Sequence, residues 1–305
     1  MFPLVFIVAV YKSKRGDEME SHPVSGKPRI EKKFYIIGDE RVFHTKAPEY
    51  FSAIMKRVGI KGTYEPFMVK PGEIEKAVRE IRNLNVAGAN VTIPYKEAVI
   101  PYLDELSEGA TIIGSVNTIV RKGDKLKGYN TNAIGFMDAL KDAGFDAAGK
   151  SVLVFGTGGA ARAVVFILNW VHAKSILITG RSQDKTHSIV NQIGGEAISM
   201  SALMDRILSV NLVVNATSVS SPDEGTELAE LVNRLQLSNC ELVIDLNYGR
   251  PLNFWRDMAQ SKGIRFMDGL SSLSHQAKRT LSLWTGVEVK PEIVVTAIQD
   301  STSAT

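Results

Sequence analysis

The chain has 305 residues, of which 44% are hydrophobic and 23% are charged, and its formal net charge is +3. This length allows two domains with cores of their own, and the composition is that of a globular protein. A charge this small, without a concentrated basic tract, argues against nucleic acid or a membrane surface as a partner. Cys240 is the only cysteine, so we expect neither a disulfide nor a thiolate metal site, which suits a reducing cytoplasm.

The apolar start of the chain, MFPLVFIVAV, is far shorter than the roughly 20 residues that a membrane span needs. It also lacks the basic leader and the A-x-A site of a signal peptide. The polar stretch that follows is rich in charge, proline and glycine, so residues 1–32 are expected to form a flexible N-terminal extension. The hypothesis is that translation starts near Met19 rather than at Met1; an intact mass that includes Met1 would exclude it.

From Phe34 onward, apolar strand-like runs alternate with amphipathic helical segments. We expect strands at 34–39, 62–69 and 88–93 and helices at 48–59, 71–83 and 95–106, the second of them opened by Pro71. Two more strands should flank a turn at 122–125. Strands separated by helices of about 10–15 residues predict βαβ units and a mainly parallel sheet.

A second α/β series follows residue 150, so the sequence predicts two domains with a boundary between 130 and 150. Its strands are expected at 151–156, 175–180, 196–200, 211–217, 241–246 and 264–269. Its helices are expected at 158–171, 184–194, 271–286 and 290–301.

The second series opens with a glycine-rich turn, GTGGAA, between an apolar strand and a helix. Such G-x-G-x-x-A turns let the backbone approach a pyrophosphate closely, which the helix N-terminus can then receive. The pattern favours nucleotide binding over a merely tight turn. The binding residues would be Gly156, Gly158, Gly159 and Ala160.

The next strand ends without the acidic residue that commonly binds the cofactor ribose about 20 residues after the glycines. Arg181 and Ser182 stand there instead. A guanidinium can hold a 2′-phosphate and stack on adenine, although a loop arginine in water is the simpler alternative. We therefore expect NADP rather than NAD.

Lys96, in the stretch NVTIPYKEAV, falls in the first turn of the helix expected at 95–106. The helix dipole disfavours a cation there by a few tenths to about 1 kcal/mol. An ordinary surface lysine is one explanation, and a functional lysine is the other.

The motifs NVTIPYKEAV, SVNTIV, GYNTNAIGF, VFGTGGAARAV, NATS and WTG occur in this order along the chain. Together they resemble the shikimate dehydrogenase family from Phe34 to about Ile298. The resemblance implies an α/β fold with an N-terminal substrate domain, residues 33–131 plus 270–305, and a Rossmann NADP-binding domain, residues 132–269. It also implies a metal-free, reversible and NADPH-dependent reduction of 3-dehydroshikimate to shikimate.

The resemblance makes Lys96 the catalytic lysine. Its ammonium would stabilise the charge that develops on a ketone oxygen and supply a proton, and a positive helix end would lower its pKa toward the working pH.

Simpler structural roles in a turn, a strand or the core are the alternative for the implied binding residues. For the substrate these are Thr45, Thr92, Asn117, Tyr248 and Gln276, and for the cofactor they also include Thr217 and Gly269.

The sequence also departs from the family pattern. Asn132 stands where the family has an aspartate that pairs with the lysine, so part of an acid–base contribution of about 10²–10⁴ in rate would be lost. In the motif that holds the substrate carboxylate, Thr45 keeps one hydroxyl, Ala47 lacks the other, and Lys46 adds a cation. Ser220 replaces a glycine and Ser272 a methionine.

These departures leave three functions open. The first is a shikimate or quinate dehydrogenase with NADP, slowed by Asn132, and the second is a relative that reduces another cyclic keto compound. The third is a catalytically silent protein that binds NADP or a shikimate-like ligand. In each case we expect a small-molecule partner, a cytoplasmic location, and either a monomer or a homodimer.

Overall fold

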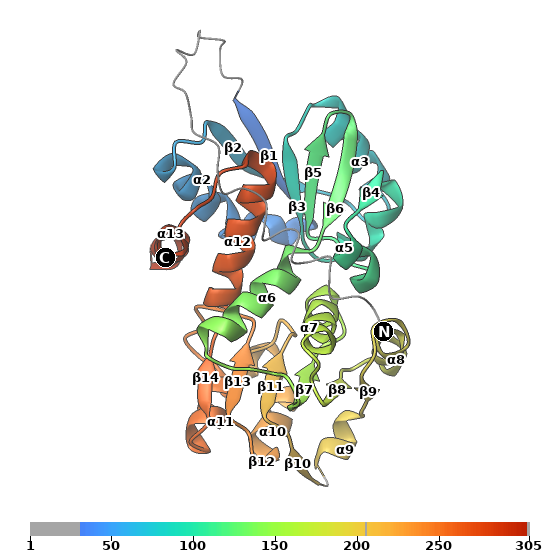
Figure 1. The fold of residues 1–305 in the computed structure, drawn as a ribbon, viewed down its shortest axis with the longest axis vertical. Helices are drawn as coiled ribbons and strands as arrows, with labels where there is room; N and C mark the ends of the chain where they lie inside the picture. Colours follow the sequence, from blue (N-terminus) through green and yellow to red (C-terminus); the bar gives the residue numbers. More distant parts are fainter. Residues whose placement is uncertain (1–30, 205, 304–305) are drawn as a thin grey trace, which may run out of the picture. The chain divides into compact units, whose positions relative to one another are not determined.

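The computed structural model describes residues 31–204 and 206–303, and the expectations for residues 1–30, including the choice between Met1 and Met19, lie outside them. Within these residues the chain forms two six-stranded sheets and one two-stranded sheet, with helices on both faces of each large sheet (Figure 1). No helix in this part of the chain is long and apolar enough to cross a membrane.

The first sheet is mainly parallel, as expected. β1 pairs in parallel with β2 and β3, and β4 with β6, while β5 runs antiparallel to both of its neighbours. The predicted turn between β5 and β6 is confirmed, with Gly123 at φ +60°. The strand order is β2 (Gly62–Met68), β1 (Lys32–Gly38), β3 (Gly88–Val91), β5 (Thr118–Lys122), β6 (Lys125–Tyr129), β4 (Glu105–Leu106).

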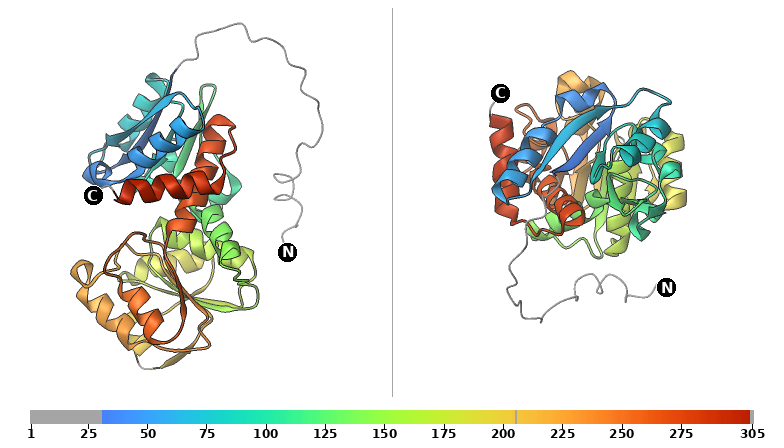
Figure 2. Two further views of the ribbon diagram at one scale, coloured as in Figure 1. Left: turned by 90° about the vertical axis from the view of Figure 1, so that its left-hand side faces the viewer. Right: turned by 90° about the horizontal axis from the view of Figure 1, so that it is seen from above.

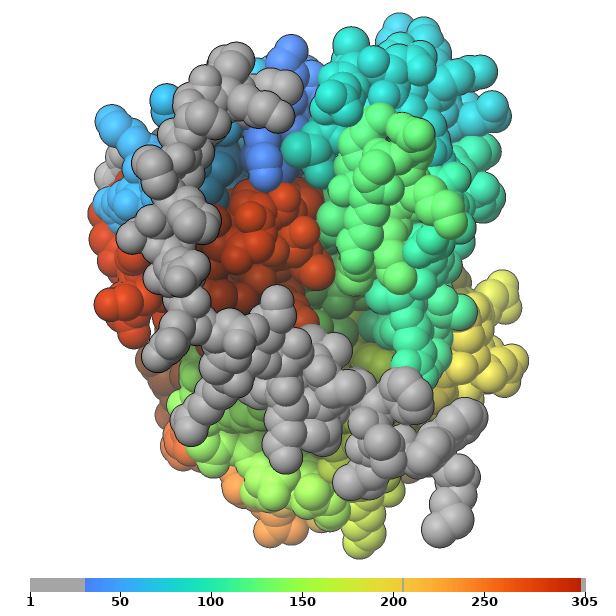
Figure 3. Space-filling model, turned by 45° about the horizontal axis from the view of Figure 1, so that its top comes forward, coloured from blue at the N-terminus to red at the C-terminus, as the bar shows by residue number. Residues whose placement is uncertain are grey.

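Both faces of this sheet are buried because its strands carry apolar side chains on each side. In β1, Phe34 and Ile36 join one core cluster and Ile37 joins the other. The first cluster is completed by α2 (Ala47–Arg57), α12 (Leu270–Thr285) and α13 (Pro291–Ser303), so the last two helices pack with the first strands (Figures 2 and 3). The second is completed by α3 (Ile74–Asn83) and α5 (Glu108–Ile113).

The second sheet is entirely parallel. Read outward from β7, it has β8 and β9 on one side and β11, β13 and β14 on the other, which is the Rossmann strand order. β10 (Ile207–Ser209) and β12 (Gln236–Ser238) form the separate two-stranded sheet. The main strands are β7 (Ser151–Phe155), β8 (Ser175–Thr179), β9 (Glu196–Ala197), β11 (Leu212–Asn215), β13 (Leu242–Asp245) and β14 (Arg265–Met267).

Alternating apolar side chains bury this sheet on both faces too. In β7, Val152 and Val154 belong to one cluster and Leu153 and Phe155 to the other. Three helices complete the first cluster: α6 (Thr131–Asp142), α7 (Gly159–Trp170) and α8 (Gln183–Gln192). The second is completed by α9 (Met200–Met204), α10 (Thr226–Arg234) and α11 (Phe254–Ser261).

One predicted helix is wrong over most of its length. Instead of spanning 95–106, the helix α4 covers Tyr95–Ala98, a 3-10 turn covers Ile100–Tyr102, and β4 follows. Pro101 explains the break, because it has no backbone N–H and its ring would clash with the carbonyl of Glu97 in a continued helix. The helix expected from Pro71 likewise begins later, at Ile74.

Candidate functional site

The glycine-rich turn lies at the centre of the second sheet, between β7 and α7. Gly156 has φ +122°, and a Cβ built there would lie 2.8 Å from Ala216 O in the loop after β11. Its N–H donates to Thr179 O, 2.8 Å away at the end of β8. The turn therefore sits where the strand order reverses, the place where open α/β sheets bind ligands.

The first turn of α7 is suited to an anion. Gly158 is its N-cap, and the turn contains no acidic side chain. A Cβ at Gly158 would meet no atom within 4 Å. The residues present thus fit the pyrophosphate of a dinucleotide, which needs free N–H groups and close backbone approach.

Gly159 brings Lys96 and Ser115 up to this turn. A Cβ built on Gly159 would lie 3.3 Å from Lys96 Cδ and 2.5 Å from Ser115 Oγ. Ser115 Oγ is buried and has no hydrogen-bond partner in the described part of the chain. The NVTIPYK and SVNT motifs therefore meet the glycine-rich turn at one residue.

Lys96 is partly buried, and burial lowers the pKa of its ammonium to about 8. The helix-end explanation for this lowering is not supported, because α4 has only four residues and burial is the cause that applies. The backbone is fixed by Val116 N–H, which donates to Lys96 O at 2.7 Å. Within residues 31–204 and 206–303, the ammonium has no hydrogen-bond or ion-pair partner, so no hydrogen bond joins it to Asn132.

Asn117 and Asn132 are joined directly. Asn117 Nδ2 donates to Asn132 Oδ1 and to Thr131 Oγ1, each at 2.9 Å. Asn117 Oδ1 accepts from the Thr131 N–H at 2.7 Å. Both amide hydrogens of Asn117 are therefore used within the protein, and its assignment to substrate binding stays a prediction.

A ring of threonine hydroxyls connects this pair to α12. The hydroxyls of Thr118, Thr131 and Thr280 lie 3.1–3.3 Å from one another and are buried. Gln276 Nε2 donates to Thr280 Oγ1 at 3.2 Å. Gln276 thus belongs to the same polar network as Asn117 and Asn132.

The other predicted substrate residues have local roles. Thr45 Oγ1 accepts from Ala47 N–H at 3.2 Å, and Thr92 N–H donates to Ile37 O at 2.8 Å. Tyr248 packs against the core cluster that includes α2, and burial raises the pKa of its phenol. Among the described residues, no side-chain hydrogen bond links these three to Lys96 or Asn132.

Arg181 follows the end of β8 and is exposed, without an ion pair or hydrogen bond among the described residues. Its neighbour Gly180 lies against the glycine-rich turn, because a Cβ there would be 2.6 Å from Thr157 Cγ2. Ser182 is the N-cap of α8, with its hydroxyl accepting from Lys185 N–H at 3.3 Å. The arginine is thus placed near the turn and free to bind an anion.

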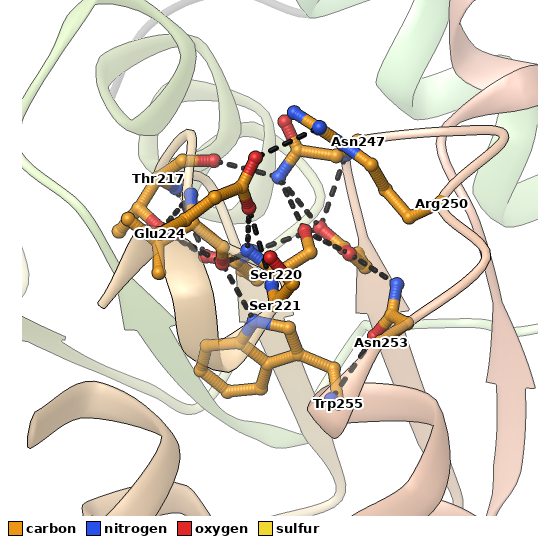
Figure 4. A network of polar contacts seen from close by, with 11 residues as sticks. Thr217, Ser220, Ser221, Glu224, Asn247, Arg250, Asn253 and Trp255 are labelled. Carbon is orange, nitrogen blue, oxygen red and sulfur yellow. Dashed lines mark hydrogen bonds and ion pairs between the residues drawn. The ribbon is translucent and has the colours of Figure 1, made fainter. Parts of the chain in front are cut away.

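Asp245 is a buried residue that the sequence reasoning missed, and it organises the loops after β11 and β13. Figure 4 shows the surrounding polar network, with Thr217, Asn247 and Asn253 among its labelled members. Asp245 accepts from the side chains of Asn215 at 2.8 Å and Asn253 at 2.7 Å. Thr217 is held from both sides in this network: its Oγ1 donates to Asn215 Oδ1 at 2.7 Å, and its carbonyl accepts from Asn247 Nδ2 at 2.9 Å. The available signal was an aspartate at the end of an apolar strand, at the ligand-binding edge of the sheet.

Gly269 and Ser272 lie at close backbone contacts. A Cβ at Gly269 would collide with Leu246 O, and one at Gly135 in α6 would lie 2.5 Å from Ser272 O in α12. Gly269 therefore holds the start of α12 against the loop after β13.

Comparison with known proteins places the chain in a family. Residues 36–119 match the shikimate dehydrogenase substrate binding domain, and residues 139–268 match shikimate / quinate 5-dehydrogenase. Over 263 residues the chain is 38% identical to shikimate dehydrogenase (NADP(+)) of Desulforamulus reducens, covering 83% of this chain and 90% of that protein. The chain belongs to the shikimate dehydrogenase family.

Solved structures agree with this family. Shikimate dehydrogenase of Aquifex aeolicus gives a TM-score of 0.78 at 31% identity, over 90% of this chain and 100% of that one. Shikimate 5-dehydrogenase of Thermus thermophilus, solved with NADP(H) and shikimate, gives a TM-score of 0.76 at 30% identity. The match covers 88% of this chain and 99% of that one. The family and the α/β fold with a Rossmann sheet, both predicted from the motifs, are confirmed.

Proposed function

We propose that the chain is an NADP-dependent oxidoreductase that reversibly reduces 3-dehydroshikimate to shikimate. The observation that carries this proposal is the contact of Lys96 with Gly159, which puts a lysine of lowered pKa beside the nucleotide turn. The relatives support it as well, since they are named NADP-dependent shikimate dehydrogenases at 32–38% identity over most of the chain. The expected metal-free chemistry requires only a cofactor, a proton donor and a substrate site.

For the cofactor, we propose that the glycine-rich turn and the N-terminus of α7 hold the pyrophosphate and that Arg181 with Ser182 holds the 2′-phosphate. Bound NADPH supplies the hydride. Thr217 and Gly269 fix the loops after β11 and β13 that border the same edge of the sheet. This arrangement supports NADP as the cofactor through charge, because the exposed Arg181 guanidinium, unpaired among the described residues, attracts a phosphate.

For the reaction, Lys96 is the proposed proton donor. Its ammonium stabilises negative charge as it develops on the ketone oxygen, and transfer of its proton gives the alcohol. A pKa near 8 leaves the lysine mainly protonated at neutral pH yet able to release the proton. Asn132 is proposed as the second catalytic residue, which can hydrogen-bond the ligand but cannot exchange a proton. The proposed substrate contacts are Thr45, Thr92, Asn117, Tyr248 and Gln276.

We propose residues 33–131 with 270–305 as the substrate domain and residues 132–269 as the cofactor domain. The shared core of α12, α13 and the first sheet supports this division, as does the packing of α6 on the second sheet. The proposed location is cytoplasmic, on the ground of the single cysteine. A homodimer remains as compatible with the sequence as a monomer.

A second candidate is reduction of another cyclic keto compound. It is favoured by the changed carboxylate motif. There the Thr45 hydroxyl already accepts from the Ala47 N–H, and Lys46 Nζ lies 3.4 Å from Glu49 Oε1. The test is NADPH oxidation with 3-dehydroshikimate and with related cyclic ketones, for the protein and for Lys96→Ala. Turnover of 3-dehydroshikimate that is lost in Lys96→Ala, with NADPH binding retained, is the expected result. NADPH binding without turnover of 3-dehydroshikimate would reject the proposed substrate.

A further inference from the structure

We infer that Asn117 orients the Asn132 amide so that position 132 offers the ligand an N–H donor, and that the site therefore prefers the ketone to the alcohol. This inference rests on the proposed function, since it concerns which of the two partners of that reaction is held more tightly. Asn117 acts as a positioning residue and Asn132 as the residue that discriminates.

The orientation begins with a group that can only donate. The Thr131 N–H lies 2.7 Å from Asn117 Oδ1, so the oxygen of that amide must face the backbone. A flipped Asn117 would set its NH₂ against this N–H, two donors facing each other in a buried place. The direction of the Asn117 amide follows from the protein alone.

The same logic passes to Asn132. With its oxygen toward Thr131, Asn117 turns its NH₂ toward position 132, where it donates to Asn132 Oδ1 at 2.9 Å. Asn132 Oδ1 is thereby committed, and its own NH₂ is the group left over. In residues 31–204 and 206–303, that NH₂ makes no hydrogen bond, and Asn132 is only partly buried.

An aspartate at this position would present an acceptor, and Asn132 presents a donor. A ketone oxygen has lone pairs and no hydrogen, so it can be fully satisfied by donors. An alcohol can also accept from the Asn132 N–H. At neutral pH, where Lys96 is mainly protonated and can only donate, the O–H of the alcohol then lacks the acceptor that a carboxylate would provide. A hydroxyl hydrogen left without a partner weakens binding of the alcohol, and one such group corresponds to about a tenfold change in affinity.

The experiment compares the dissociation constants of shikimate and 3-dehydroshikimate, measured by calorimetry without cofactor. The readout is their ratio in the unchanged protein and in two variants. Asn132→Asp restores an acceptor when the pH is above the pKa of the new carboxyl group. The dissociation constant of shikimate divided by that of 3-dehydroshikimate should then fall about tenfold. In Asn117→Asp, one carboxylate oxygen keeps the hydrogen bond from Thr131 N–H, and the other accepts from the Asn132 NH₂. The Asn132 oxygen then faces the ligand as an acceptor, so the ratio of the two dissociation constants should also fall.

Thr280→Ser is the matched control, because it trims the same network without reversing any hydrogen bond, and its ratio should stay unchanged. An equal ratio in the unchanged protein and in Asn132→Asp would overturn the inference while leaving the proposed reaction intact. Should Asn117→Asp fail to fold, Asn132→Asp alone decides the question. Binding of neither compound to any of the proteins would instead reject the proposed substrate, and the inference with it.

Discussion

Ser220 Oγ lies 2.6 Å from Asp245 Oδ2, and both residues are completely buried. The same carboxylate also accepts from Asn215 and Asn253 side chains and from the Asn247 N–H. Ser220, which we expected to replace a glycine of the family pattern, is thus held by an aspartate at the end of β13. Its hydroxyl makes two hydrogen bonds inside the network, donating to Asp245 Oδ2 and accepting from Asn247 Nδ2 at 2.9 Å.

Asp245→Ala is expected to lower the free energy of unfolding by about 2–4 kcal/mol, because several buried donors lose their acceptor at once. Urea denaturation measures this directly. Asp257→Ala, which removes an exposed carboxylate from α11, should change stability by no more than about 0.5 kcal/mol. Similar losses in the two variants would show that the network contributes little.

Gly159→Ala is expected to cost about 1–3 kcal/mol of stability, since the new methyl group would lie 2.5 Å from Ser115 Oγ. Ser115→Ala alone should be neutral or slightly stabilising, because the buried hydroxyl has no partner among the described residues. In the double variant the nearest remaining serine atom would be Cβ, at 3.6 Å, so much of the loss should be recovered. A double-mutant cycle of thermal unfolding tests this, and strict additivity would contradict the contact.

The two directions of the reaction should respond oppositely to pH. Burial lowers the pKa of Lys96 to about 8, and reduction of the ketone needs the protonated lysine, whereas oxidation of the alcohol needs the neutral one. The kcat/KM for reduction should therefore fall as pH rises through about 8, and that for oxidation should rise. Initial rates from pH 6 to 10 provide the check. Profiles that move together would remove Lys96 from the proton transfer.

Except for the short edge strand β4, which falls inside the helix expected over 95–106, the strands of the two large sheets were predictable because both of their faces are buried, which gives continuous apolar runs such as that of β7. The prediction of a helix over 95–106 failed because it relied on the spacing of apolar residues and did not take Pro101 into account. α6 was missed although Asn130 caps it, its side chain accepting from Ala133 N–H at 3.2 Å. The local signal was present there, but it lay in a stretch read as a domain boundary.

The site was predictable only as a set of motifs. Their order along the chain indicated the residues, but the meeting of Lys96, Ser115 and Gly159 depends on how three separate segments of the chain fold together. The direction of the Asn117 amide was likewise inaccessible, because a backbone N–H from another element fixes it. Polar networks of this kind are set by tertiary geometry, which periodicity in the sequence does not encode.

Arg181→Ala should weaken NADP binding about tenfold or more and leave NAD binding nearly unchanged, because the exposed guanidinium has only the 2′-phosphate as its proposed partner. Dissociation constants for both cofactors, measured by fluorescence at fixed salt, give the ratio. Arg234→Ala removes an equal charge from the last turn of α10 and is the matched control, with no expected change in the ratio. Equal weakening of NADP and NAD by Arg181→Ala would mean that the arginine maintains the loop after β8 rather than selecting the phosphate.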